Sequence, residues 1–281
     1  MAPIIKQHTS GSLAASGGRV SYPPFSPNTA TPKLHTHEMC EIYCVFRGNG
    51  HYVTEGTQHK LEPGKILLMR PGEAHKVYLT GNEPYERLAH HFPMSVVDGV
   101  DPERRLLAPF FDRPLGLHNV YERSAVAKTK IYDLFSTMHN QKEDDYATEL
   151  NTTVVLLAVL AELRTLFDHK LYLPPDDNSA KMHAVLEYIN ENLTRELSVE
   201  QVCTKFFLSR GQLNRGFKKA TGTTLWDYVM TKRLLLAKMY IADGMHTGQA
   251  SAACGFRDYS AFYRAYLKKY GTPPSVSDTP L

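Results

Sequence analysis

The spacing of hydrophobic and turn-forming residues changes twice along this chain of 281 residues. Between residues 31 and 92, short runs rich in β-branched and aromatic residues, such as 41–46 and 65–69, are separated by the turn sequences RGNG, LEPGK, RPGE and TGNEP. Short strands divided by glycine- and proline-containing turns are typical of antiparallel sandwiches and barrels. The first part of the chain is therefore predicted to be an antiparallel β-sandwich or β-barrel.

Residues 124–140 and 146–168 have apolar positions at helical spacing and predict two helices. The second helix has two apolar stripes, one formed by Leu150, Val154, Leu157 and Ala161 and the other by Leu156, Leu160, Leu163 and Phe167. Two stripes indicate packing against two surfaces, of which one is the barrel and the other is either a partner subunit or the same large core. Because the apolar run 154–161 is much shorter than the roughly 20 residues of a membrane span, we expect a buried helix.

A change in composition at residues 171–180 (LYLPPDDNSA) predicts a domain boundary, because paired prolines and small polar residues are typical of exposed linkers. The chain is thus divided into residues 1–170, a linker at 171–180 and residues 181–281. The last part is helical in pattern, and two capping boxes, Ser198 with Gln201 and Ser209 with Gln212, predict helix starts.

The pattern from residue 198 to residue 219 predicts a helix-turn-helix unit, with a helix at 199–205, a connection at 206–208 and a second helix after Ser209. The apolar positions that would join the two helices are Val202, Leu208, Leu213 and Phe217. On the opposite face of the second helix lie Arg210, Asn214, Arg215 and Lys218. These side chains suit base edges and phosphates of double-stranded DNA, so this helix is predicted to be a recognition helix.

A second, similar unit follows about fifty residues later. It has a short helix at 247–254, a turn at 255–256 and a basic helix at 258–270, and residues 225–240 read as one longer helix between the units. The polar side chains of its basic helix are Tyr259, Ser260, Arg264, Lys268 and Lys269. Two such units make DNA the expected partner of this part of the chain.

The distribution of charge supports that assignment. The net charge of +3 divides into +6 for residues 181–281, with 14 Lys and Arg against 8 Asp and Glu, and −3 for residues 1–180. A basic domain has the positive electrostatic potential expected of a protein that binds the phosphates of nucleic acid. The four cysteines form no CxxC pair and the N-terminus has no apolar signal region, which favours reduced thiols and a cytoplasmic protein.

Residues 183–275 closely resemble the DNA-binding domain of the AraC/XylS family of transcriptional regulators. The matching positions are Ser209, Leu213, Arg215, Phe217, Thr221–Gly222, Arg233–Leu234, Ala237, Gly255–Phe256, Tyr259–Ser260, Phe262, Arg264 and Gly271–Thr272–Pro273. The resemblance implies that the two recognition helices enter successive major grooves and that bases are read by Asn214, Arg215, Ser260 and Arg264, with Arg210 and Tyr259 as further candidates.

Other residues of this region receive their expected roles from the same resemblance. Lys218, Lys268 and Lys269 are expected to contact phosphate groups or to add to the positive electrostatic potential that attracts DNA. Gly211 departs from the family, whose members often present a longer side chain to the bases at this position. The aromatic residues Trp226, Phe262 and Tyr266 are expected in the core.

Two segments of the first domain resemble the motifs of the cupin barrel. The first has the spacing HxHxxxE(x6)G from His35 through His37 and Glu41, and the second runs from Gly64 to His75. On a strand, alternation would turn the motif side chains to one face and the cysteines at positions 40 and 44 to the other. Arg70 stands where the second motif has proline.

The cupin resemblance implies three alternatives for His35, His37, Glu41 and His75. They bind a divalent metal, since imidazoles and a carboxylate suit iron, manganese, nickel or zinc, they contact an organic ligand directly, or they are structural remnants. Tyr43 shares the parity of Glu41 and either lines the pocket or fills the barrel. The histidines at positions 51, 59, 90 and 91 lack a comparable spacing and are expected to be ordinary surface or packed residues.

The sequence therefore predicts an α+β two-domain protein, with a cupin-like β-barrel and flanking helices followed by an all-α domain with two helix-turn-helix units. Its expected function is ligand-responsive transcriptional regulation, preferentially activation, by a homodimer joined near residues 124–168, with a sugar-like effector in the barrel. The family resemblance adds RNA polymerase as a partner. No catalysis, required cofactor or membrane is expected. The alternatives are a direct metal-sensing regulator and a metal-dependent cupin enzyme with a DNA-binding tail.

Overall fold

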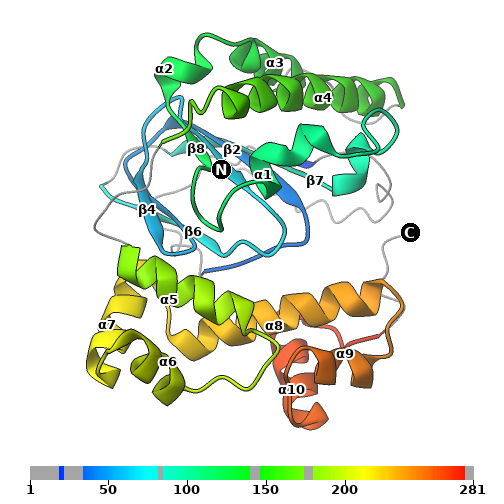
Figure 1. The fold of residues 1–281 in the computed structure, drawn as a ribbon. Coiled ribbons are helices and arrows are strands. Elements are labelled where there is room, and N and C mark those ends of the chain that lie inside the picture. The colour runs from blue at the N-terminus through cyan, green and yellow to red at the C-terminus, as the bar shows by residue number, and fades with distance from the viewer. Residues whose placement is uncertain (1–18, 22–33, 82–84, 140–145, 174–179, 276–281) are drawn as a thin grey trace, which may run out of the picture.

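The computed structural model describes residues 19–21, 34–81, 85–139, 146–173 and 180–275. Figure 1 shows an N-terminal domain of strands and helices lying against a C-terminal domain built only of helices. The predicted α+β architecture with two domains is confirmed.

The N-terminal domain contains two antiparallel sheets that enclose a common apolar interior. One has the strand order β1 (Arg19–Ser21), β7 (Glu86–Phe92), β2 (Cys40–Arg47), β5 (Ile66–Met69) and β8 (Val120–Tyr121), and the other has the order β4 (Thr57–Lys60), β3 (Gly50–Thr54) and β6 (His75–Leu79). Tyr43 and Tyr52, from different sheets, belong to the same buried cluster between them. The two sheets form a cupin-like arrangement rather than one closed barrel.

Alternation along β2 directs neighbouring side chains to different cores, as expected for a strand covered on both faces. Tyr43 and Val45 lie in the interior between the sheets. Cys40, Ile42 and Cys44 lie on the outer face, in the cluster that also contains the long helix α4 (Tyr146–Asp168). The predicted opposite orientation of the cysteines is thus confirmed.

The helices of the N-terminal domain cover this outer face (Figure 1). They are η1 (Met94–Val97), η2 (Arg105–Leu107), α1 (Ala108–Phe111), α2 (Arg123–Val126), α3 (Ile131–His139) and α4. The bounds predicted for α4 are confirmed, but the single helix predicted at 124–140 is wrong. The Thr129 hydroxyl donates to Val126 O and accepts from Ile131 N, and this local bonding ends α2 before α3 begins.

Helix α4 has one buried and one exposed apolar face. Leu156, Leu160 and Leu163 are fully buried in the outer core, whereas Leu150 and Val154 are 49% and 55% exposed. The expectation that the whole apolar run is buried is therefore only half right. Among the described residues, the stretch Leu150–Asp168 is also the one helix whose length and mean hydropathy of 1.6 would allow a membrane span, although its core face packs on the sheet.

The C-terminal domain consists of α5 (Ala180–Glu191), α6 (Val199–Phe206), α7 (Arg210–Thr221), α8 (Leu225–Ala242), α9 (Thr247–Ala253) and α10 (Tyr259–Tyr270). Figure 1 shows α6 and α7 at one end of α8 and α9 and α10 at the other. Both predicted capping boxes are present, because Ser198 and Ser209 accept backbone N–H groups and their glutamine partners reciprocate.

Two apolar clusters hold the helices of this domain, one around Phe217 and Tyr228 and the other around Phe262 and Tyr266. The core positions predicted for Phe262 and Tyr266 are confirmed. Trp226 was also expected in the core, but this prediction is wrong, since its side chain, in the first turn of α8, is 44% exposed.

The first residues of the predicted linker lie on the N-terminal domain. Leu173 N donates to Val120 O at 2.8 Å, and Tyr172 forms a bridge with Tyr121. Helix α5 starts at Ala180, and residues 174–179 lie outside the described part of the chain.

Candidate functional site

The first recognition helix, α7, presents a polar face to solvent. Leu213 and Phe217 are fully buried on one side, while Arg210, Asn214, Arg215 and Lys218 are exposed on the other. Arg210 forms an ion pair with Glu200 of α6, which joins the two helices of the unit. The four side chains predicted to face DNA thus lie together on an accessible surface.

Gly211 provides the space for one of these side chains. A Cβ atom at Gly211 would lie 3.3 Å from Nη1 of Arg215, so the guanidinium group packs over the glycine. Because position 211 is glycine here, the Arg215 guanidinium occupies space that a longer side chain at position 211 would fill.

The second recognition helix, α10, begins at a capped N-terminus. The Asp258 carboxylate accepts the backbone N–H groups of Ser260 and Ala261, and the Tyr259 hydroxyl lies 3.1 Å from Oγ1 of Thr247 on α9. Arg264 and Lys268 are exposed along the same helix. The polar residues predicted on this helix are again accessible.

Lys269 differs from its neighbour Lys268. Its Nζ donates to Thr231 O of α8 at 3.2 Å, and burial of the amine lowers the pKa of Lys269 to about 8. The amine therefore bonds within the domain, whereas phosphate contact was expected, although the side chain as a whole remains exposed.

Arg233 joins the two helix-turn-helix units. Its guanidinium group is almost buried and donates three hydrogen bonds of 2.8 Å, to the carbonyl oxygens of Leu193, Arg195 and Gly255. Gly255 has a φ of +81°, and a Cβ there would lie 2.8 Å from Thr194 O. The resemblance identified both residues by pattern, and the structure shows that Arg233 connects α8 to the segment between α5 and α6 and to the turn between α9 and α10.

A second polar site lies in the N-terminal domain, where imidazoles surround the buried carboxylate of Glu41. The distances from Oε2 of Glu41 to Nε2 are 2.8 Å for His37, 3.2 Å for His75 and 3.4 Å for His91. Burial alone would raise the pKa of Glu41, but hydrogen bonds from the three histidines hold it well below its usual value. The carboxylate is therefore held negative, with a hydrogen bond to Nε2 of His37 and the Nε2 atoms of His75 and His91 close to the same oxygen, although Nε2 of His75 makes no hydrogen bond of good geometry.

The structure brings the predicted residues together but not by the predicted route. Strand β2 begins only at Cys40, so strand alternation does not apply to His35 and His37, which precede it. His35 forms an isolated bridge with His75, and the two rings lie 4.3 Å apart. The four motif residues thus meet through the packing of the segment before β2 against β6.

His91 belongs to this site, although the sequence analysis assigned it no special role. In the antiparallel pairing of β2 and β7, His91 lies directly opposite Glu41. The signal that would have revealed it is this strand register, which spacing along the sequence does not contain.

The donor set fits a divalent metal ion. The ligand atoms of His37, Glu41 and His91 lie within 4.8 Å of one another, and His75 faces the same carboxylate oxygen. Imidazole nitrogens with one carboxylate are a common combination for divalent transition metals. The residues therefore suit a metal as well as a hydroxyl-bearing organic molecule.

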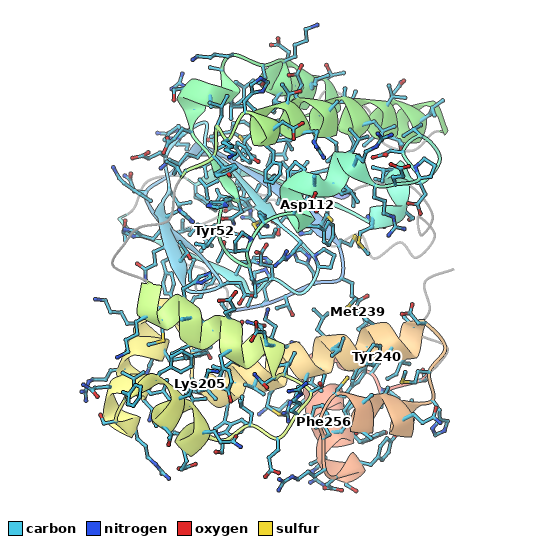
Figure 2. The ribbon with its side chains drawn as sticks, in the orientation of Figure 1. Tyr52, Asp112, Lys205, Met239, Tyr240 and Phe256 are labelled. Carbon is cyan, nitrogen blue, oxygen red and sulfur yellow. The ribbon has the colours of Figure 1, made fainter. Side chains whose placement is uncertain are left out.

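Tyr43 occupies the interior behind this cluster. Its ring centroid lies 4.7 Å from that of Tyr52, and the Tyr52 ring is stacked on His75 at 6.0 Å. Figure 2 shows Tyr52 within the N-terminal domain. The inward orientation predicted for Tyr43 is observed, with its ring filling space between the sheets.

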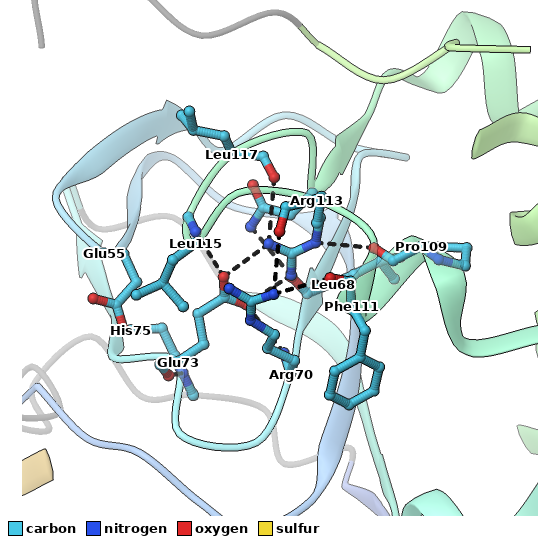
Figure 3. Close-up of polar contacts among 12 residues, drawn as sticks. Glu55, Leu68, Arg70, Glu73, His75, Pro109, Phe111, Arg113, Leu115 and Leu117 are labelled. Carbon is cyan, nitrogen blue, oxygen red and sulfur yellow. Dashed lines mark hydrogen bonds and ion pairs between the residues drawn. The ribbon is translucent and has the colours of Figure 1, made fainter. Parts of the chain in front are cut away.

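A buried ion pair fixes the segment that carries His75 (Figure 3). Arg113 donates to both carboxylate oxygens of Glu73 at 2.8 and 2.7 Å, and neither side chain is exposed. Arg113 thereby holds the pKa of Glu73 below its usual value despite burial. Because the Glu73 carbonyl accepts the Nδ1–H of His75 at 2.8 Å, Nε2 of that ring is directed at Glu41.

Comparison with protein families gives two matches that follow the two domains. Residues 26–154 match the AraC-like ligand binding domain, and residues 202–277 match a helix-turn-helix domain. Together these matches cover the Glu41 cluster and most of both recognition units.

Comparison with individual proteins gives relatives that span nearly the whole chain. The probable transcriptional regulator LumQ of Photobacterium leiognathi is 29% identical over 242 residues, which cover 86% of this chain and 90% of the relative. The HTH-type transcriptional activator RhaS of Citrobacter koseri is 24% identical over 259 residues, covering 91% and 90%.

Among solved structures, ToxT from Vibrio cholerae aligns over 92% of this chain and 97% of its own, with a TM-score of 0.40 and 11% identity. The two domain matches, the relatives of nearly full length and the paired recognition units lead to one assignment. The chain belongs to the AraC family of ligand-responsive, DNA-binding transcriptional regulators.

Proposed function

We propose that a small-molecule effector binds at the Glu41 cluster and thereby changes how the protein engages DNA. The observation that carries this proposal is the convergence of three imidazoles on one buried carboxylate. His37 and His91 are 21% and 29% exposed, so a molecule from solvent reaches this side of the cluster. An effector acts by binding two states of the regulator with different affinity.

A sugar or a related polyhydroxylated molecule is the effector class that we propose first. A carboxylate accepts hydrogen bonds from hydroxyl groups, and neutral imidazoles both donate and accept them. The buried Tyr52 ring, stacked on His75, fixes the orientation of that imidazole behind the site. The site thus offers several hydrogen-bonding groups to the hydroxyls of a sugar.

The experiment is differential scanning fluorimetry of the metal-free protein with a panel of sugars, organic acids and aromatic compounds, because a ligand that binds the native state raises its stability. We expect a saturable shift from a sugar that disappears in His37→Ala and persists in His51→Ala, since His51 lies exposed on β3 outside the cluster. Tight binding confined to non-carbohydrates would refute the sugar assignment.

A direct metal sensor is the second candidate, favoured by the mutual approach of the His37, Glu41 and His91 ligand atoms. A divalent metal there would supply a positive charge that organises these side chains. The test is metal analysis of the purified protein combined with DNA binding in chelator and in added metal, without organic ligand. Metal-dependent DNA binding that is lost in His91→Ala would place this candidate first.

We further propose that the regulator is a homodimer joined through α4. The support is the apolar face of Leu150 and Val154, which lies opposite the buried face of the same helix. Sedimentation velocity is expected to show a dimer that Leu150→Glu converts to monomer, while the exposed neighbour Asn151 tolerates change to Asp. A monomeric wild-type protein at micromolar concentration would refute the proposal.

Activation through RNA polymerase, in the cytoplasm and without catalysis or a membrane, completes the proposed function. Its support is that RhaS, a relative of nearly full length, is named a transcriptional activator. A transcription assay with purified polymerase is expected to show more transcript when protein and effector are both present. Loss of transcript would indicate a repressor, and consumption of the effector would indicate an enzyme.

A further inference from the structure

The turn between β3 and β4 inserts an acidic residue into the C-terminal domain. Glu55 is 2% exposed, and its carboxylate accepts hydrogen bonds from the Tyr228 hydroxyl and from Nζ of Lys232, both on α8. Tyr228 also accepts a hydrogen bond of 2.7 Å from Nδ2 of Asn190 on α5. Glu55 is therefore bonded to one domain while belonging to the other.

The backbone around this turn lies in close contact with the helices of the first DNA-binding unit. A Cβ at Gly56 would collide with Cδ1 of Leu186 on α5. Gln58 Nε2 donates to Lys219 O of α7 at 3.1 Å, and the Tyr78 side chain lies directly against Gly222. The end of the recognition helix α7 is thus held on the β3–β4–β6 sheet.

The buried charges of Glu55 and Lys232 make partial opening of this interdomain contact unfavourable. The Lys232 ammonium group is 6% exposed and also donates to Gly72 O at 2.6 Å, so both charges of the pair are removed from water. A buried carboxylate that loses its partners is strongly unfavourable, and so is a buried ammonium. Separation of the domains therefore requires that the whole group be broken and hydrated together.

Tyr228 takes part as a hydrogen-bond donor. Burial, together with the negative charge of Glu55, raises the pKa of Tyr228 well above its usual value. The phenol consequently keeps its proton, so its hydroxyl donates a hydrogen bond to Glu55 while its oxygen accepts one from the Asn190 amide. Its role does not depend on physiological pH.

Glu55 is also bonded to the residue that precedes His75. Ala74 N donates to Oε1 of Glu55 at 2.5 Å, and Glu55 N donates to Ala74 O at 2.8 Å. Ala74 itself packs in the apolar cluster of the C-terminal domain with Leu186 and Phe217. Ala74, in the contact between the domains, is therefore the direct chain neighbour of His75, which belongs to the Glu41 cluster.

We propose that Glu55, Tyr228 and Lys232 form an interdomain latch that holds the DNA-binding domain on the sensing domain and lowers its affinity for DNA. Docking is expected to lower the affinity for DNA because residues 1–180 carry a net charge of −3 and residues 181–281 a net charge of +6. Screening confines this field to about 8–10 Å at physiological salt, so the acidic domain opposes phosphate binding only while it is docked. This inference goes beyond the proposed effector and requires no knowledge of its identity.

The test is the affinity of the full chain for a random-sequence DNA duplex, measured by fluorescence anisotropy. We expect Glu55→Gln and Lys232→Met each to tighten binding by about fivefold or more, the lower range of ordinary coupling between sites. Lys232→Met is the more informative variant, because loss of a positive charge from a DNA-binding domain would by itself weaken binding. Unchanged or weakened binding in Lys232→Met would overturn the proposal.

Glu62→Gln is the matched control for charge. Glu62 follows β4, is 41% exposed and pairs with Lys60 and Lys65 within its own domain. If it tightens DNA binding as much as Glu55→Gln, the effect is general electrostatics and the latch is refuted. The fluorescence of Trp226 confirms that each variant retains a folded C-terminal domain.

Hydrogen exchange of the DNA-free protein gives a second, independent measurement. The bonds that cross between the domains join Glu55 to Tyr228 and Lys232, so both latch variants are expected to exchange faster in the peptide that contains the start of α8. Exchange in β2 should be unchanged, because its bonds lie within the sensing domain. Unchanged protection at the start of α8 in both Glu55→Gln and Lys232→Met would overturn the latch even if DNA affinity changed.

Discussion

Replacement of Arg233 by methionine tests whether the two DNA-binding units are held together by one side chain. Methionine retains most of the length and apolar stem of arginine but removes the guanidinium group. Three hydrogen bonds of 2.8 Å to main-chain carbonyls are lost at once. Hydrogen bonds to charged groups contribute roughly 1.5–3 kcal/mol each.

The expected loss is smaller than the sum of three such bonds. The three contacts are only partly buried, so water replaces some of them in the variant. We therefore expect a decrease of about 3–4 kcal/mol in the free energy of unfolding of the C-terminal domain. With a urea dependence of about 1.5–2 kcal/mol per molar for a domain of this size, the midpoint should fall by roughly 2 M.

Urea unfolding followed by fluorescence measures this change selectively, because the chain has a single tryptophan, Trp226, on α8 of the C-terminal domain. Arg257→Met is the control, since Arg257 is 77% exposed and pairs only with the exposed Glu196. An exposed ion pair contributes about 0–1 kcal/mol. If the two variants unfold at the same urea concentration, Arg233 does not join the units.

Further outcomes are expected for phosphate contact, acid stability and base reading. Lys268→Met should reduce the salt dependence of DNA binding by about one ion, whereas Lys269→Met should leave it unchanged because Lys269 bonds to α8; equal effects would contradict the structure. Burial lowers the pKa of His59 to about 4. The unfolded chain therefore takes up this proton near pH 6.5 and the folded protein does not, so stability is complete above that pH and is lost as the pH falls toward 4. Thermal melts at about pH 5 should show roughly 1–2 kcal/mol less stability than at neutral pH, and less of this loss in His59→Leu. Gly211→Ala should stabilise α7 by about 0.5–1 kcal/mol and leave the preference for operator over random DNA unchanged, because the exposed Arg215 guanidinium, whose Nη1 would lie 3.3 Å from the new methyl group, can move aside; a lower urea midpoint for this variant would contradict this reasoning.

The features of the C-terminal domain that the sequence predicted well are those encoded locally. Ser198 and Ser209 cap helices with residues three positions away, and this interaction is visible in any four-residue window. Trp226 was misplaced because an apolar pattern shows which residues share a stripe, not how much of the stripe neighbouring helices cover.

The features that were missed depend on contacts between distant segments. His91 joins Glu41 only through the register of β2 and β7. Glu55 shows no apolar or motif signal, and its role appears only when α8 packs against its turn. Even the break between α2 and α3, which is local, rests on the two hydrogen bonds of the Thr129 hydroxyl rather than on hydrophobic spacing.

The position of Ala74 has a consequence for the construction of chimeric regulators. This alanine belongs by sequence to the sensing domain, yet its side chain completes the apolar core of the DNA-binding domain. A graft at the linker that brings in a foreign α8 without tyrosine and lysine at positions 228 and 232 would leave Glu55 buried against unsuitable neighbours. The unit that evolution or an engineer can exchange in this protein is therefore larger than a domain, because it includes the β3–β4 turn that the new domain must accommodate.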